Sequence, residues 1–142
     1  MVVLDTNVLS ALMRERPEPR VAAWLDSLPP ESVWTTAITA FEIHFGLELL
    51  PPGRRRTRLA AEFGRLIEED LERRVLPFDS AAAAAAAGIA AAARAAGRTI
   101  EIQDAQIAGI VRSRRGALAT RNARHFQHAG ISVIDPWEEP AP

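Results

Sequence analysis

The chain has 142 residues, a formal net charge of −1, and hydrophobic and charged fractions of 48% and 25%, which suits one globular domain with a buried core. It contains no cysteine, so disulfides and thiolate zinc sites are excluded, and no apolar run approaches the roughly 20 residues that cross a membrane, so we expect a cytoplasmic protein without a signal peptide. All 17 basic residues are arginine, which excludes a Walker A phosphate loop with its lysine but still allows phosphate binding.

The first ten residues, MVVLDTNVLS, are the most informative stretch of the chain. The apolar residues 2–4 end at Asp5, which predicts a short buried strand followed by a helix from Thr6 to about Met13. In an open α/β sheet, ligands bind beyond the carboxyl ends of the strands, where an acid can hold a metal ion. Asp is also a favoured N-cap, so this stretch alone leaves Asp5 open between metal ligand and helix cap.

Strands and helices alternate along the rest of the chain. In chain order we expect helices over 6–13 and 18–28, a strand over 31–35, helices over 36–50 and 54–74, a strand over 75–78, helices over 81–96 and 104–115, and strands over 117–120 and 131–134. Phe41–Phe45 alternates like a strand, but the length of the segment 36–50 and the stop at Pro51 favour a helix. A capping box from Thr39 to Glu42 fits that helix.

Helical segments of this length between strands are typical of βαβ units. We therefore predict a three-layer α/β/α fold with a four- or five-stranded, mostly parallel sheet, in a single domain over residues 1–137. The proline-rich residues 138–142 are expected to form a loose tail. The helix over 81–96 is almost pure alanine, the best intrinsic helix former, and we assign it a structural role only.

Three carboxylates stand apart from the solvent-facing acids, namely Asp5, Glu42 and Asp104. Each has an alternative at a helix start, as an N-cap for Asp5 and Asp104 and within a capping box for Glu42. If the strand order brings them together, they repel one another and raise each other's pKa. A divalent cation would neutralise such a cluster, and oxygen ligands suit Mg²⁺ or Mn²⁺.

Five motifs, in this order, resemble the PIN-domain ribonucleases of the VapC toxin type, and most of all their FitB-like branch. They are MVVLDTNVLS, TAITAFE at 36–42, DAQIA at 104–108, ATRN at 119–122 and IDPW at 134–137. The set covers nearly the whole chain. The resemblance implies the α/β/α fold predicted above and metal-dependent endonuclease activity on RNA.

The resemblance also assigns roles to particular residues. Asp5, Glu42 and Asp104 match the acidic positions with which the family binds Mg²⁺ or Mn²⁺ and carries out catalysis. Thr6 and Thr120 match positions where the family has a supporting hydroxyl near the site.

The segment after the fourth strand departs from the family pattern. The family often has a fourth acid near Asn122 or His125, where this chain has none, so a second metal is not implied. The Asn122 amide can still orient a water at the site, whereas His125 is expected at the surface or in packing, and Glu101 in solvent unless it compensates for the missing acid. Arg121 and Arg124 can hold flanking phosphates, with a structural ion pair as an equal alternative for Arg121.

In the implied reaction, a metal ion lowers the pKa of a water and stabilises charge on the scissile phosphate, and in-line attack leaves a 5′-phosphate and a 3′-hydroxyl. The expected substrate is structured RNA, either tRNA or rRNA. The alternative function, favoured by the missing fourth acid, is a PIN-fold protein with a weakened site that binds antitoxin or RNA without turnover. A magnesium-dependent phosphatase fits poorly, because the chain lacks lysine and has no second aspartate two residues after Asp5.

The resemblance further implies partners. The chain would be the toxin of a toxin–antitoxin pair, inhibited by a VapB-type antitoxin whose C-terminal segment lies in the active-site groove and often inserts an arginine among the acids. A homodimer, a higher assembly with the antitoxin, and binding of operator DNA only through the antitoxin are expected. A housekeeping RNA-processing nuclease would share the same site.

Overall fold

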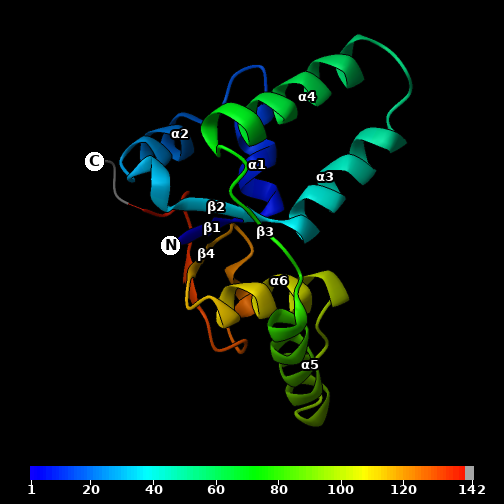
Figure 1. Cartoon of the computed structure of the whole chain (residues 1–142), viewed down its shortest axis with the longest axis vertical. Coiled ribbons are helices and arrows are strands. Elements are labelled where there is room, and N and C mark those ends of the chain that lie inside the picture. The colour runs from blue at the N-terminus through cyan, green and yellow to red at the C-terminus, as the bar shows by residue number, and fades with distance from the viewer. Residues whose placement is uncertain (140–142) are drawn as a thin grey trace.

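A five-stranded parallel sheet forms the centre of the computed structural model, which describes residues 1–139 (Figure 1). Its strands are β1 (Val2–Leu4), β2 (Val33–Thr36), β3 (Val75–Leu76), β4 (Ala117–Ala119) and β5 (Ser132–Ile134). They are arranged in the order β3-β2-β1-β4-β5, and every neighbouring pair is parallel. The chain therefore adds β2 and then β3 on one side of β1, and later β4 and then β5 on the other side. The strand order reverses between β1 and β4, which is where open α/β sheets bind ligands.

Six α-helices surround the sheet (Figure 1). They are α1 (Thr6–Met13), α2 (Pro19–Asp26), α3 (Ala37–Leu49), α4 (Arg54–Arg65), α5 (Ser80–Ala95) and α6 (Ile102–Ser113). Short 3₁₀ helices cover Pro30–Ser32 and Ala123–Phe126, and a π-helical turn covers Leu66–Asp70. Figure 1 shows α3 and α4 as a hairpin that projects from the sheet, with α5 and α6 together at the opposite end of the molecule.

Two hydrophobic cores lie on the two faces of the sheet, because successive side chains of a strand point to opposite faces. Leu4 and Ala119 pack into a core with α1, α2, α3 and α4. Val3 and Leu118, their neighbours in the same strands, pack into a second core with α5 and α6. This arrangement confirms the predicted three-layer α/β/α fold and the upper of the two expected strand numbers.

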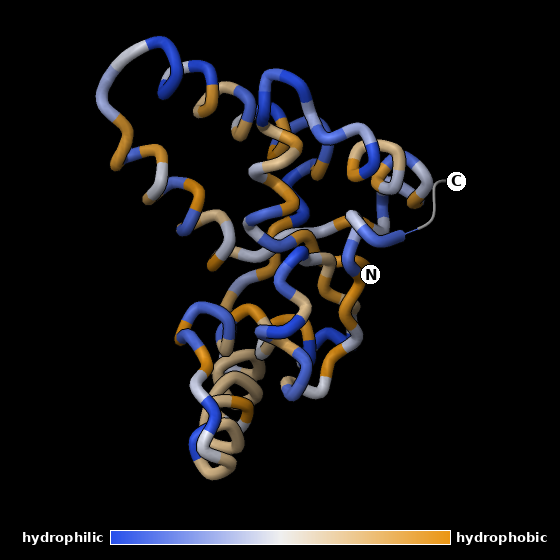
Figure 2. The backbone as a smooth tube through the Cα atoms, turned by 180° about the vertical axis from the view of Figure 1, so that it is seen from behind, coloured by the Kyte–Doolittle hydropathy of each residue, from blue (hydrophilic) through white to orange (hydrophobic). Residues whose placement is uncertain are grey.

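Helix α5 packs unusually closely on α6. A Cβ added at Gly109 of α6 would lie 2.6 Å from the backbone oxygen of Ala82 and 2.7 Å from the Cβ of Ala86. The alanines of α5, which are uniformly tan along the helix in Figure 2, leave room for this approach, whereas α4 alternates between hydrophilic and hydrophobic residues. Because α6 carries Asp104, this contact positions one of the three candidate acids.

One expected boundary is wrong. The helix predicted over 54–74 is regular only to Arg65; it continues as the π-helical turn and ends in a reversal where Glu72 and Arg73 have φ of 46° and 60°. The helix predicted over 104–115 begins two residues earlier, at Ile102, which is 68% exposed. The other elements agree with the predicted ranges to within about two residues at each end.

The C-terminal segment follows β5 as a turn. Trp137 and Glu138 donate backbone hydrogen bonds to Asp135, and the Arg20 guanidinium donates to the backbone oxygen of Glu139 at 2.9 Å. The rest of the tail predicted over 138–142, from 140 onwards, lies outside the described residues. Within residues 1–139, no helix is long and apolar enough to span a bilayer.

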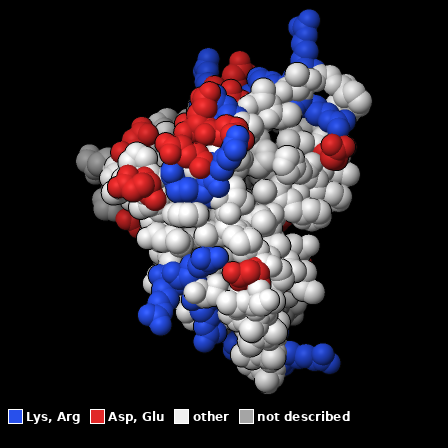
Figure 3. Space-filling model, viewed as in Figure 1, with Lys and Arg blue, Asp and Glu red and all other residues white. Residues whose placement is uncertain are grey.

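Charge is distributed unevenly over the molecule. On the face in Figure 3, acidic side chains gather over the part that contains α2 and the end of α4. The charged side chains over the part built by α5 and α6 are mostly arginine. In the sequence, residues 79–128 contain seven arginines and three acids, a formal charge of +4, whereas the whole chain has a formal charge of −1.

Candidate active site

Two residues mark the switch point of the sheet. Asp5 follows β1 directly and Thr120 follows β4 directly, so both stand at the carboxyl ends of adjacent parallel strands. The backbone amide of Asp5 donates to the carbonyl of Ala119 at 2.9 Å, which continues the ladder to this point. The fold therefore brings a residue of the first motif and a residue of the fourth motif into contact.

The Asp5 carboxylate is buried, with 5% of the residue exposed, and both of its oxygens accept hydrogen bonds. One oxygen accepts from the backbone N–H of Thr6 at 2.8 Å, so Asp5 is the N-cap of α1. The other accepts from the hydroxyl of Thr120 at 2.7 Å. Burial raises the pKa of Asp5, and these two hydrogen bonds oppose that effect. The two roles considered for Asp5, helix cap and metal ligand, are thus compatible, because the cap uses only one of its carboxylate oxygens.

Glu42 reaches the same place from α3. Its Oε1 accepts from the Thr6 hydroxyl at 2.9 Å, so Thr6 joins Glu42 to Asp5 through its side chain and its backbone amide. Burial raises the pKa of Glu42, and the charges of Asp5 and Asp104 raise it further, which shows that the three acids share one electrostatic environment. The predicted capping box is wrong, because Thr36 is the N-cap of α3 and accepts from the backbone of Thr39.

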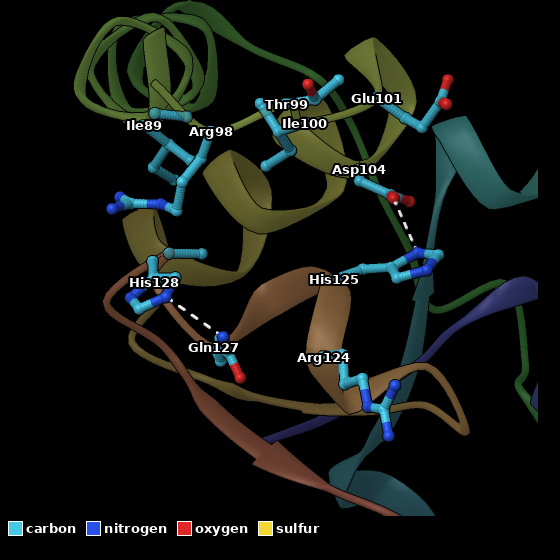
Figure 4. Close-up of a pocket in the computed structure, with 12 residues that line it drawn as sticks. Ile89, Arg98, Thr99, Ile100, Glu101, Asp104, Arg124, His125, Gln127 and His128 are labelled. Carbon is cyan, nitrogen blue, oxygen red and sulfur yellow. Dashed lines mark hydrogen bonds and ion pairs between the residues drawn. The ribbon is translucent and has the colours of Figure 1, made fainter. Parts of the chain in front are cut away.

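Asp104 approaches from the first turn of α6. It is not the N-cap, as one alternative had it, because Glu101 occupies that position. Burial and the charge of Asp5 raise the pKa of Asp104, and His125 opposes this shift. The Asp104 carboxylate lies 3.2 Å from Nδ1 of His125, which is exposed, as expected, and contacts one of the three acids without lining their cavity (Figure 4).

All three acids line one open cavity of about 400 Å³, together with Thr6, Asn7 and Asn122. Carboxylate, hydroxyl and amide oxygens are the ligands that a hard divalent cation prefers. Within residues 1–139, no three acidic or histidine side chains are already arranged closely enough to ligate one ion directly. The oxygen donors of the cavity fit the chemistry of Mg²⁺ or Mn²⁺, and Mg²⁺ in proteins usually keeps several waters.

Asn7 also lines the cavity, although the sequence patterns assign it no role. Its amide nitrogen donates to Thr120 at 3.2 Å and lies 3.5 Å from Asp5, and its amide oxygen accepts from the backbone of Arg121 at 3.0 Å. Asn7 therefore ties α1 to the loop after β4 and fixes the geometry around Asp5. The sequence signal for Asn7 is its place in the first motif. Polar residues early in a helix are common, so that place alone does not predict a site residue.

The residues after β4 form the rim of the cavity. Asn122 lines it, and its backbone amide donates to the Thr120 hydroxyl at 3.1 Å. Arg121 also lines it, with its guanidinium 4.8 Å from the centre of the Trp137 ring. Arg121 makes no ion pair with any residue in 1–139, so the structural alternative for it is a cation–π contact rather than a salt bridge. Arg124 and Glu101 lie outside this cavity.

Comparison with known proteins identifies the family. The family model described as the PIN domain matches residues 2–131. The chain belongs to the PIN-domain family. It is 38% identical over 138 residues to the VapC ribonuclease Y4jK of Sinorhizobium fredii, covering 97% of this chain and 99% of that protein. It is 37% identical over 139 residues to the toxin FitB of Neisseria gonorrhoeae, covering 98% and 100%.

A solved structure supports the same assignment. The chain superposes on a chain of FitAB bound to an IR36 DNA fragment with a TM-score of 0.88 and 37% identity, over 99% of this chain and 98% of that one. Within the PIN-domain family, the chain therefore groups with the VapC and FitB proteins. The order of the five motifs predicted this membership.

Proposed function

We propose that the chain is a divalent-metal-dependent endoribonuclease that acts as the toxin of a toxin–antitoxin pair. The observation that carries the proposal is the meeting of Asp5, Glu42 and Asp104 in one cavity at the switch point of the sheet. The names of its relatives, a VapC ribonuclease and a FitB toxin, support the reaction class and the biological role. The proposed substrate is structured RNA, either tRNA or rRNA.

The proposed roles follow from the contacts. Asp5, Glu42 and Asp104 would hold Mg²⁺ or Mn²⁺, which when bound lowers the pKa of a water and neutralises charge on the scissile phosphate. Thr6 and Thr120 fix the orientation of Glu42 and Asp5 through their hydroxyls. These supporting hydrogen bonds leave each carboxylate with free lone pairs toward the cavity.

Residues of the rim act on the substrate in this proposal. The Asn122 side chain orients a water, in the position where the family often has a fourth acid. Arg121 binds a phosphate next to the scissile one, since its guanidinium is exposed at the cavity and stacks on Trp137. Attack by a metal-activated water needs no covalent nucleophile from the protein, so direct attack by water is the proposed reaction class.

We also propose an antitoxin of the VapB type as the partner, with homodimers and a larger assembly that binds operator DNA through the antitoxin. The solved structure of FitAB bound to an IR36 DNA fragment supports a larger assembly that binds DNA. The acid-lined cavity is open, so a guanidinium from a partner can enter it and replace the charge of the ion. Toxicity on expression that the neighbouring gene relieves would distinguish this role from housekeeping RNA processing.

The test is cleavage of total tRNA and rRNA by the purified chain with Mg²⁺, Mn²⁺ or EDTA, beside Asp5→Asn. We expect discrete products that need both the metal and Asp5. Asp79→Asn is the matched control, because Asp79 is also a helix N-cap that accepts a backbone N–H, from Ala82, but lies away from the cavity. Asn caps helices as well as Asp does, so neither variant should lose its helix.

The alternative is a binding protein with a weakened site, and the replacement of the family's fourth acid by Asn122 favours it. A folded chain, freed of any copurified antitoxin, that cleaves no RNA at any Mn²⁺ concentration would establish that alternative. Cleavage by Asp5→Asn at the wild-type rate would refute the proposed site.

A further inference from the structure

A second cavity adjoins the acidic one. It has a volume of about 440 Å³, within the range of roughly 300–1,000 Å³ of small-molecule sites, and Asp104 lines both cavities. Residues from α5, from the loop between α5 and α6, and from the segment 124–129 form its walls. Figure 4 shows Arg98 and His128 on one side of it and the Asp104–His125 pair on the other. A ligand that extends from the acids past this pair would therefore enter it.

The walls combine two arginines, two acids (Glu101 and Asp104) and apolar groups. Arg98 and Arg124 both line the cavity, and neither forms an ion pair with any residue in 1–139, so both guanidinium groups are available to an anion. Ile89 and Ala129 are buried beneath the cavity and give it an apolar surface. A nucleotide needs hydrogen-bond donors for its phosphate and an apolar surface for its base.

His128 supplies a flat ring at the opening of this cavity. Its Nε2 lies 3.1 Å from the amide nitrogen of Gln127, so the ring is held by its neighbour while the residue stays exposed. Imidazole rings stack on unpaired bases in RNA-binding sites. The surrounding segment 79–128, with its formal charge of +4, provides the wider field that attracts a polyanion.

We propose that this cavity is a subsite for one nucleotide of the RNA substrate, next to the scissile phosphate, with Arg98 on its phosphate and the His128 ring against its base. The proposal rests on the proposed function, because it takes RNA as the substrate of the adjoining acids. It names a substrate contact that the acidic cavity does not contain.

The test measures RNA binding without cleavage. The full-length chain carrying Asp5→Asn is titrated into fluorescein-labelled unfractionated tRNA, followed by fluorescence anisotropy, at several salt concentrations. Adding Arg98→Gln should weaken binding about fivefold to tenfold and lower the salt slope by roughly 0.7, the value for one phosphate contact on a single strand. Arg94→Gln is the matched control, since Arg94 belongs to the same basic region but does not line the cavity, and it should change binding less than twofold.

The His128 contact has its own pair of variants. His128→Ala should weaken binding about threefold to tenfold, whereas His128→Phe, which keeps a ring for stacking, should bind within about twofold of the parent. Unchanged thermal unfolding of each variant excludes a folding defect. Equal losses for Arg94→Gln and Arg98→Gln would overturn the subsite and leave a diffuse electrostatic surface. Failure of RNA cleavage by the wild-type chain would instead refute the proposed function, whatever the binding data show.

Discussion

The close contact between α5 and α6 gives a prediction whose size follows from the structure. In Gly109→Ala, the new Cβ would meet the backbone oxygen of Ala82 at 2.6 Å, about 0.8 Å inside the 3.4 Å at which ordinary contact begins. It would also meet the backbone nitrogen and the Cβ of Ala86 at 2.7 Å. Backbone atoms cannot rotate away, so the helices must separate. Overpacking of this kind costs about 1–3 kcal/mol, even though alanine favours a helix by about 1 kcal/mol.

The matched substitution is Gly88→Ala on α5, where a Cβ would meet nothing within 4 Å. There, only the helix preference acts, and we expect a gain of about 0.5–1 kcal/mol. Scanning calorimetry should give a Tm lowered by roughly 3–9 °C for Gly109→Ala and raised by roughly 1.5–3 °C for Gly88→Ala. Because α6 carries Asp104, the first variant should also lose RNA cleavage below its Tm. A Gly109→Ala protein as stable as Gly88→Ala would refute the packing argument.

Three further predictions concern the acids. Thr120→Val removes the hydroxyl that donates to buried Asp5 and should lower the free energy of unfolding by about 1–3 kcal/mol. Urea titrations measure this change, and the variant should also lose RNA cleavage. An unchanged urea midpoint would contradict the prediction. Asn122→Asp adds a fourth acid and should tighten Mn²⁺ binding in calorimetry while lowering the metal-free Tm; weaker Mn²⁺ binding would count against the site. The folded chain binds protons on Asp5, Glu42 and Asp104 more tightly than the unfolded chain, so metal-free stability should fall as the pH rises from the ordinary carboxyl range through their raised pKa values and then level off. Excess Mn²⁺, which binds the ionised carboxylates, should oppose this fall, and a metal-free stability that rises over the same pH range would refute the prediction.

Much of the fold was readable in the sequence because local patterns agreed with it. The apolar run before Asp5 predicted β1, and the alternation that sends Val3 and Leu4 to opposite faces is the simple consequence of strand geometry. The helix predicted over 81–96 ends before Gly97, which has the left-handed φ of 72° that favours glycine.

The errors occurred where two local patterns competed. Both Thr36 and Thr39 precede a helical run by the right spacing for a cap, and Thr36 caps α3 because β2 ends there. Ile102 is apolar but exposed, and α6 begins there, two residues before the predicted start. The π-helical turn after Arg65 has no sequence signature that distinguishes it from the regular amphipathic pattern before it.

The convergence of the acids was beyond local pattern. It depends on β1 lying between β2 and β4, and periodicity does not determine the spatial order of strands. The family resemblance supplied the link for Asp5, Glu42 and Asp104. The roles of Asn7 and His125 depend on contacts across the chain, with Thr120 at 3.2 Å and with Asp104 at 3.2 Å, and only the structure reveals them.

Binding of Mn²⁺ to the metal-free chain tests the central claim most directly, because the account requires the three acids to hold a divalent ion. Electron paramagnetic resonance of free Mn²⁺ measures the bound fraction without relying on activity or on knowledge of the RNA. We predict saturable uptake by the wild-type chain and by Asp79→Asn, and loss of that uptake in Asp5→Asn. Equal uptake by Asp5→Asn, or none by the wild-type chain, would contradict the metal site.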